Sequence, residues 1–251
     1  MGRASPLLAG AFIALAAAVG AYYAAARSLP NFTVWWEVVI LAFLVIPAVF
    51  ALVYFALPLW RARGLLAVGV AVAVLAGALD AAELDVLANF AKLGAVTLLA
   101  FWFLGYFETA AWVVLVALIV PWVDAISVWR GPTKHIVTHQ REVFTTFSIA
   151  FPVPGEQNTA QLGLPDVLFF ALFLAATVRF GLRTRLTWLA MTLSFGGTMA
   201  LAVAFDINGL PALPLLALGF LAPNADLIWK RLRAEGAWGR LESKRSEAAG
   251  P

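Results

Sequence analysis

Successive runs of apolar residues, each about 20 residues long, fill most of this chain, and a helix of that length crosses the ~30 Å hydrocarbon layer of a bilayer. The first run begins near residue 6 and the last ends near residue 229. Charged residues make up only 12% of the chain, whereas about 25% is usual in soluble domains. The sequence therefore predicts an integral membrane protein.

Hydropathy and the positions of Gly and Pro predict an all-α, polytopic transmembrane bundle of about eight helices. The predicted helices span residues 6–26, 35–59, 65–83, 90–107, 110–130, 163–182, 186–206 and 210–229. An Ala-x-Ala sequence ends the first run at Ala26, so a cleaved signal peptide is an alternative there. The length of that run favours a retained helix. The chain has no Cys, which excludes disulfides and thiolate metal sites.

The basic residues gather at the ends of the predicted helices. Eight crossings put both termini on one side of the membrane, and that side carries twelve of the seventeen Lys and Arg. Lys and Arg are enriched in short cytoplasmic loops, so we expect both termini in the cytoplasm. The loop at 131–162 would then be external, and the basic tail at 231–251 cytoplasmic. The chain carries no nucleic-acid-binding motif.

Two carboxylates interrupt the apolar segments. Asp124 lies in "VLVALIVPWVDAISVWR" (114–130), where Pro121 is expected to bend the helix. Asp166 lies in "QLGLPDVLFFALF" (161–173), where Pro165 suits a first helical position and the helix dipole favours an anion. An ionised Asp inside a bilayer costs on the order of 3 kcal/mol, so each should face protein or water.

The order of crossings predicts where these carboxylates lie. The helix with Asp124 leaves into the loop from which the helix with Asp166 enters, so both sit shortly inside the same membrane face. The last helix begins at that face with "GLPALPLL" (209–216). Two close carboxylates in a low dielectric share a proton, so one can act as acid and the other as base on a water that attacks an amide. Such a pair titrates jointly, and neither Asp receives a separate role.

Three motifs, "VDAISVW" (123–129), "LGLPDVLFF" (162–170) and "LPALPLL" (210–216), follow one another in the second half of the chain. In order and spacing they resemble the presenilin and signal peptide peptidase family of intramembrane aspartyl proteases, over about residues 108–230. That family carries Tyr-Asp, Gly-x-Gly-Asp and Pro-Ala-Leu in the corresponding helices. The resemblance implies a catalytic pair and a set of substrate-binding positions. These are Asp124 and Asp166 for catalysis, and Gly163, Leu164, Pro211, Ala212 and Leu213 for substrate binding.

The resemblance also implies an organisation and a setting. Residues 1–107 would form an N-terminal membrane portion of four helices, 108–230 the catalytic helices, and 231–251 the tail. The chain looks most like prokaryotic signal-peptide-peptidase-like members, which implies a multi-pass protein of a prokaryotic plasma membrane. Its partners would be transmembrane-segment substrates and membrane lipid, and it would need no cofactor or metal. The sequence leaves the oligomeric state and the identity of the substrate open.

Two positions depart from the family pattern. Val123 stands where the family has Tyr, and Pro165 stands where it has the Gly before the second Asp. A catalytically degenerate relative that acts as a membrane scaffold therefore remains an alternative. A proton-coupled transporter that uses the two carboxylates as a relay is another, although the chain lacks an inverted repeat.

Two features of the external loop allow further hypotheses. Residues 142–154, "EVFTTFSIAFPVP", have extended, β-branched and aromatic character, and we hypothesise that they pair with an unwound substrate by strand addition. An ordinary amphipathic loop on the membrane surface is the alternative. His135 and His139 have the i, i+4 spacing of a zinc site, but Ile136 replaces the Glu of a His-Glu-x-x-His motif. Solvated histidines are therefore the preferred interpretation.

Overall fold

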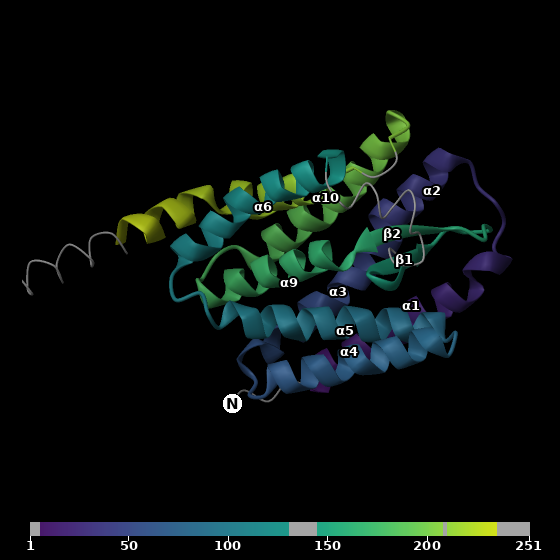
Figure 1. Ribbon diagram of the computed structural model, residues 1–251, viewed down its shortest axis with the longest axis horizontal. Coiled ribbons are helices and arrows are strands. Elements are labelled where there is room, and N and C mark those ends of the chain that lie inside the picture. Colours follow the sequence, from purple (N-terminus) through teal and green to yellow (C-terminus); the bar gives the residue numbers. More distant parts are fainter. Residues whose placement is uncertain (1–5, 131–144, 208–209, 235–251) are drawn as a thin grey trace, which may run out of the picture.

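The computed structural model describes residues 6–130, 145–207 and 210–234, which fold into an all-α bundle with one small two-stranded sheet (Figure 1). The single helices are α1 (Pro6–Ala25), α4 (Leu65–Ala81), α5 (Asp85–Leu104), α6 (Ala110–Arg130), α9 (Leu164–Arg179), α10 (Thr184–Ala204) and α11 (Leu213–Leu221). The second predicted helix consists of α2 (Val34–Ile40), a π-helical turn η2 (Leu41–Val45), α3 (Ile46–Ala56) and the 3-10 turn η3 (Leu57–Arg61). Two further 3-10 turns are η1 (Ala26–Ser28) and η4 (Ala222–Asn224), and residues 225–234 are helical.

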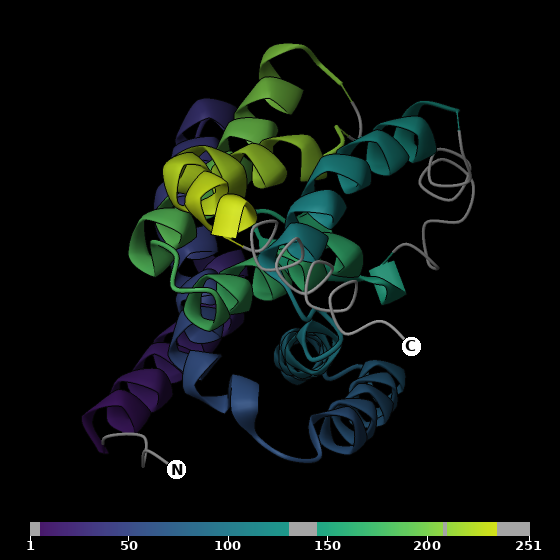
Figure 2. The ribbon, with the colours of Figure 1, turned by 90° about the vertical axis from the view of Figure 1, so that its left-hand side faces the viewer.

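All eight predicted segments are helical, and the all-α expectation is confirmed. Five stretches of the described chain are long and apolar enough to cross a membrane: residues 6–28, 34–61, 85–104, 110–128 and 184–204. The chain is a multi-pass membrane protein. Figure 2 shows α1 and α4 on one side of the bundle and α6 with α11 on the opposite side.

Several predicted boundaries need correction. The helix predicted at 90–107 is α5, which begins earlier, at Asp85. An acidic side chain in the first turn stabilises this start, because it lies at the positive end of the helix dipole. The helix predicted from 163 begins at Leu164, because Gly163 belongs to a strand. The last predicted helix begins at Leu213 and is interrupted by η4, which contains Pro223. The helix then resumes and continues to residue 234.

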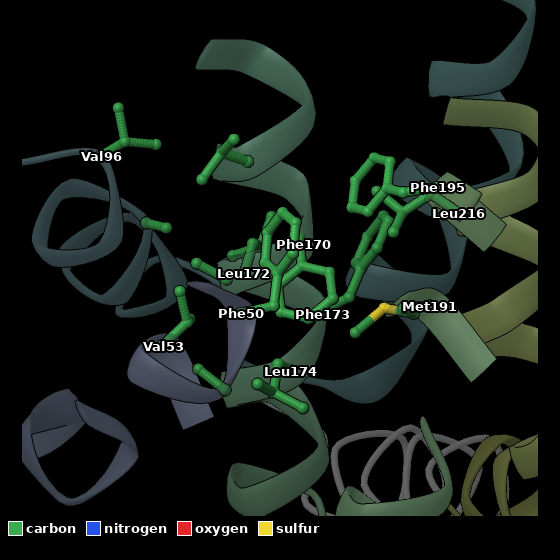
Figure 3. Close-up of a cluster of buried hydrophobic side chains, with 14 of the residues drawn as sticks. Phe50, Val53, Val96, Phe170, Leu172, Phe173, Leu174, Met191, Phe195 and Leu216 are labelled. Carbon is green, nitrogen blue, oxygen red and sulfur yellow. The ribbon is translucent and has the colours of Figure 1, made fainter. Parts of the chain in front are cut away.

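Helix α9 is the centre of the bundle and contacts α5, α6, α10 and α11. Its residues from Phe170 to Thr177 are all buried, as expected of a helix that is surrounded on every side. In Figure 3, Phe170 packs on Phe50 of α3, with ring centroids 4.1 Å apart. Phe173 stacks on Phe220 of α11 at 4.8 Å. This aromatic packing fixes α9 against both halves of the chain.

Arg179 lies at the end of α9. Its guanidinium donates a hydrogen bond to the carbonyl of Leu104, at 2.5 Å. Leu104 ends α5, and the last carbonyls of a helix lack partners within it. Arg179 therefore ties the end of α9 to the end of α5.

The small residues in "SFGGTMA" allow close helix packing, as their composition predicts. A Cβ added at Gly196 would lie 2.7 Å from the Cβ of Ala42 in the π-helical turn. A Cβ at the adjacent Gly197 would meet nothing nearer than 4.0 Å. We expect Gly196→Ala to lower the free energy of unfolding by about 1–3 kcal/mol, as overpacking does. Gly197→Ala is the matched control and should leave the thermal unfolding midpoint in detergent unchanged or slightly raised.

The two strands lie between α6 and α9 in the chain. β1 (Ser148–Pro152) and β2 (Thr159–Gly163) pair antiparallel, with Ser148 opposite Gly163 and Pro152 opposite Thr159. The side chains of Ile149 and Phe151 are buried in the core. The extended character predicted for 142–154 is thus confirmed for its described strand, whereas β2 was not predicted. Strand β2 ends at Gly163 and leads directly into α9.

Candidate active site

Asp124 is bound at the start of α11. Its Oδ2 atom accepts a hydrogen bond from the backbone N–H of Leu213 at 3.0 Å, and its carboxyl group also accepts one from the N–H of Ala212. Leu213 is the first residue of α11, and the first N–H groups of a helix have no partner within it. Asp124 therefore caps α11 from another helix, and the Pro-Ala-Leu stretch lies against it.

Asp166 is bound at the start of α9, where it is the third residue of the helix. Its carboxyl group accepts a hydrogen bond from the N–H of Gly163, the residue that caps α9. A Cβ at Gly163 would lie 3.3 Å from Asp166 Oδ2, so the absence of a side chain there allows the close approach. A third-position carboxylate that reaches back to the capping N–H is one half of a capping box.

The two aspartates are close enough for the charge of Asp124 to act on the Asp166 carboxyl group. Both are only partly accessible, and each is held by a backbone N–H at a helix N-terminus. The crossing order predicted this meeting of α6, α9 and the start of α11. The site thus contains two interacting carboxylates that are fixed by backbone N–H groups, and within the described residues no ion pair with a basic side chain holds either of them.

The predicted substrate-binding positions divide into two groups. Gly163, Ala212 and Leu213 contact the aspartates directly through their backbone. Pro211 is buried beside them in the chain. Leu164 has another role, because its N–H donates to the carbonyl of Phe147 at 3.0 Å and so joins α9 to the sheet.

The two departures from the family pattern have different settings. Val123 is 60% exposed, on the surface of α6. Pro165 is exposed and is the second residue of α9, one position later than predicted. An N–H in the first turn lacks a partner within the helix, so Pro165 removes no helical hydrogen bond.

The outer edge of β2 carries backbone groups that the sheet does not use. In an antiparallel ladder every second residue of a strand bonds to its partner strand. Because Leu164 bonds to Phe147, the residues of β2 that bond to β1 are Leu162 and Ala160. Thr159 and Gln161 therefore point their N–H and C=O groups away from β1. Within the described residues, neither group bonds to another backbone segment. The open edge of the sheet belongs to β2, whereas the sequence placed substrate pairing on 142–154.

Among the described residues there is no group of three or more His, Cys, Asp or Glu that could hold a metal ion. His135 and His139 lie outside the described residues. Sequence reasoning missed Asn89 and Lys92, two polar residues of α5 that contact the segment around β1. Their i, i+3 spacing within an apolar helix is the signal that marks them.

Comparison with known proteins adds no assignment to this geometry. No family model matches the sequence, and no curated protein matches it.

Proposed function

We propose that this chain is an intramembrane aspartyl endopeptidase that hydrolyses peptide bonds in transmembrane segments or signal-peptide remnants. The observation that carries the proposal is the interacting pair Asp124 and Asp166, held at two helix N-termini beside the Pro-Ala-Leu stretch. The setting that goes with it is a prokaryotic plasma membrane, with the C-terminus in the cytoplasm.

In the proposed reaction the pair holds one proton. The ionised carboxylate takes a proton from a bound water, whose oxygen attacks the substrate carbonyl carbon, while the protonated carboxyl group donates to the carbonyl oxygen. The tetrahedral intermediate then breaks its C–N bond. The protonated carboxyl group gives its proton to the leaving nitrogen, and the ionised carboxylate takes a proton from a hydroxyl group of the intermediate, so the pair again holds one proton. Backbone donors from Leu213 and Gly163 keep both carboxyl groups in place throughout.

A transmembrane substrate must reach this pair from the lipid. α6 packs mainly on α11 and leaves large apolar side chains exposed, among them Trp122, Val123 and Ile126. The exposed apolar face of α6 therefore offers a helical substrate a path of approach from the lipid. Cleavage also requires its helix to unwind, and unpaired backbone within a membrane must find new partners. The outer edge of β2, which runs into the residue that caps α9, offers such partners by strand addition.

An aspartyl-protease transition-state analogue with a photoreactive group tests the proposal, because such compounds bind an assembled site far more tightly than substrates do. We expect the purified protein in detergent to be labelled, and excess unlabelled analogue to prevent labelling. The scaffold and the transporter both predict no competable labelling. That result, together with no cleavage of a broad panel of transmembrane reporters, would reject the protease.

A further inference from the structure

Strand β1 is bonded to the N-terminal half of the chain at its middle and at its C-terminal end. The N–H of Ala150 donates to Asn89 Oδ1 at 3.0 Å, and the hydroxyl of Tyr22 donates to the carbonyl of Pro152 at 2.7 Å. Beyond the strand, the N–H of Gly155 donates to the carbonyl of Ala26 at 2.8 Å. The bonds at Ala150 and Pro152 use the edge of β1 that faces away from β2.

Lys92 extends this attachment to the segment before the strand. Its ammonium group pairs with Asp80 of α4 at 2.9 Å and donates to the carbonyl of Thr145 at 3.4 Å. The residue is only 8% exposed. A buried lysine in a membrane protein is costly and marks a functional position by default. Asn89 lies one turn earlier on the same face of α5, so the two side chains form one polar strip.

The attachment of β1 determines the position of the second aspartate. β1 pairs with β2, whose last residue, Gly163, caps α9 and binds Asp166. The bond from Leu164 to Phe147 closes the sheet at the helix start. A shift of β1 therefore moves both the open edge of β2 and the first turn of α9. No polar partner from the catalytic helices replaces the bond of Asn89 to β1 in the described chain.

We infer that Asn89 and Lys92 are positioning residues, which hold the sheet so that β2 and Asp166 keep the geometry that hydrolysis needs. The inference rests on the proposed function for its catalytic part. Its structural part, the attachment of β1 by Asn89, is measurable without any substrate. It gives the N-terminal membrane portion a defined task in the site.

The test compares Asn89→Leu with Asn89→Asp. Leucine has a similar size but no acceptor, whereas aspartate keeps an acceptor for the N–H of Ala150. We expect amide hydrogen exchange in peptides covering 145–163 to be about tenfold faster in Asn89→Leu and near the wild-type rate in Asn89→Asp. Leu87→Ala, on the exposed side of the same helix, is the matched control and should change nothing.

Cleavage of a transmembrane reporter supplies the second measurement. We expect Asn89→Leu to lower kcat by about 10- to 100-fold, because small displacements of catalytic groups are costly, and Asn89→Asp to restore it to within about twofold. If Asn89→Leu fails to fold, Lys92→Met compared with Lys92→Arg tests the same attachment at Thr145.

The possible outcomes are distinct. Equal exchange in Asn89→Leu and wild type, or equal loss of kcat in Asn89→Leu and Asn89→Asp, would overturn the inference. Faster exchange with an unchanged kcat would overturn it as well, since the sheet would then not position Asp166. Wild-type protein that cleaves no reporter would count against the proposed function alone, because the exchange measurement still decides the attachment.

Discussion

Asp124→Asn and Asp166→Asn are each expected to reduce cleavage of a transmembrane reporter by at least about 100-fold, the lower limit of what a positioned acid or base contributes. Asparagine keeps a carbonyl oxygen that can accept from the N–H of Leu213 or Gly163, so both caps remain. It cannot exchange a proton with water or with the substrate. The double variant should be no worse than either single variant, because residues that act as one unit are not additive.

The matched controls are Asp124→Ala and Asp166→Ala. Alanine removes the cap as well as the acid, so each should lower the free energy of unfolding by about 1 kcal/mol in addition to abolishing cleavage. Thermal unfolding in detergent separates the two effects. If the asparagine variants cleave at the wild-type rate while the alanine variants lose stability, the aspartates are structural caps and the protease proposal fails.

Gln161→Pro is expected to reduce kcat/KM by about 5- to 150-fold, the equivalent of the 1–3 kcal/mol that an unsatisfied buried polar group costs. The N–H of Gln161 points away from β1, so proline removes a donor from the open edge without removing a bond of the ladder. Proline is tolerated at such edge positions. A substrate strand would lose one partner there.

Gln161→Ala is the control for the side chain of Gln161, which accepts a bond from Ser148. Gln161→Ala keeps the backbone N–H, so its kcat/KM should stay within about twofold of the wild-type value. That change is well below the one expected for Gln161→Pro. Ala160→Pro is the control on the inner edge of β2. It removes a hydrogen bond between β2 and β1, so amide hydrogen exchange should become faster throughout the sheet. Equal kcat/KM in Gln161→Pro and Gln161→Ala would show that substrates do not add to β2.

The helices could be predicted because each depends on its own residues. Apolar runs of the right length predicted α1, α4, α6 and α10 with boundaries within a few residues. The start of α5 was misplaced because the first turn of that helix, from Asp85, is less apolar than its remainder. Only one strand of the sheet was predicted. β1 contains β-branched and aromatic residues, whereas β2, "TAQLG", has no such pattern.

The candidate site divides in the same way. Counting the predicted crossings was enough to predict that Asp124, Asp166 and the start of α11 lie close together. The partners of the carboxylates do not follow from it. Backbone N–H groups occur at every residue, and only the packing of α6 on α11 selects Leu213 as the donor to Asp124.

The sequence by itself determined that this chain is a multi-pass helical membrane protein with two carboxylates inside it, because hydropathy and charge act locally on each segment. Only the tertiary structure decided which edge of the sheet is open and that α5 holds β1 through Asn89 and Lys92. Those features depend on contacts between residues up to 61 positions apart, and a single segment contains no record of its distant partners.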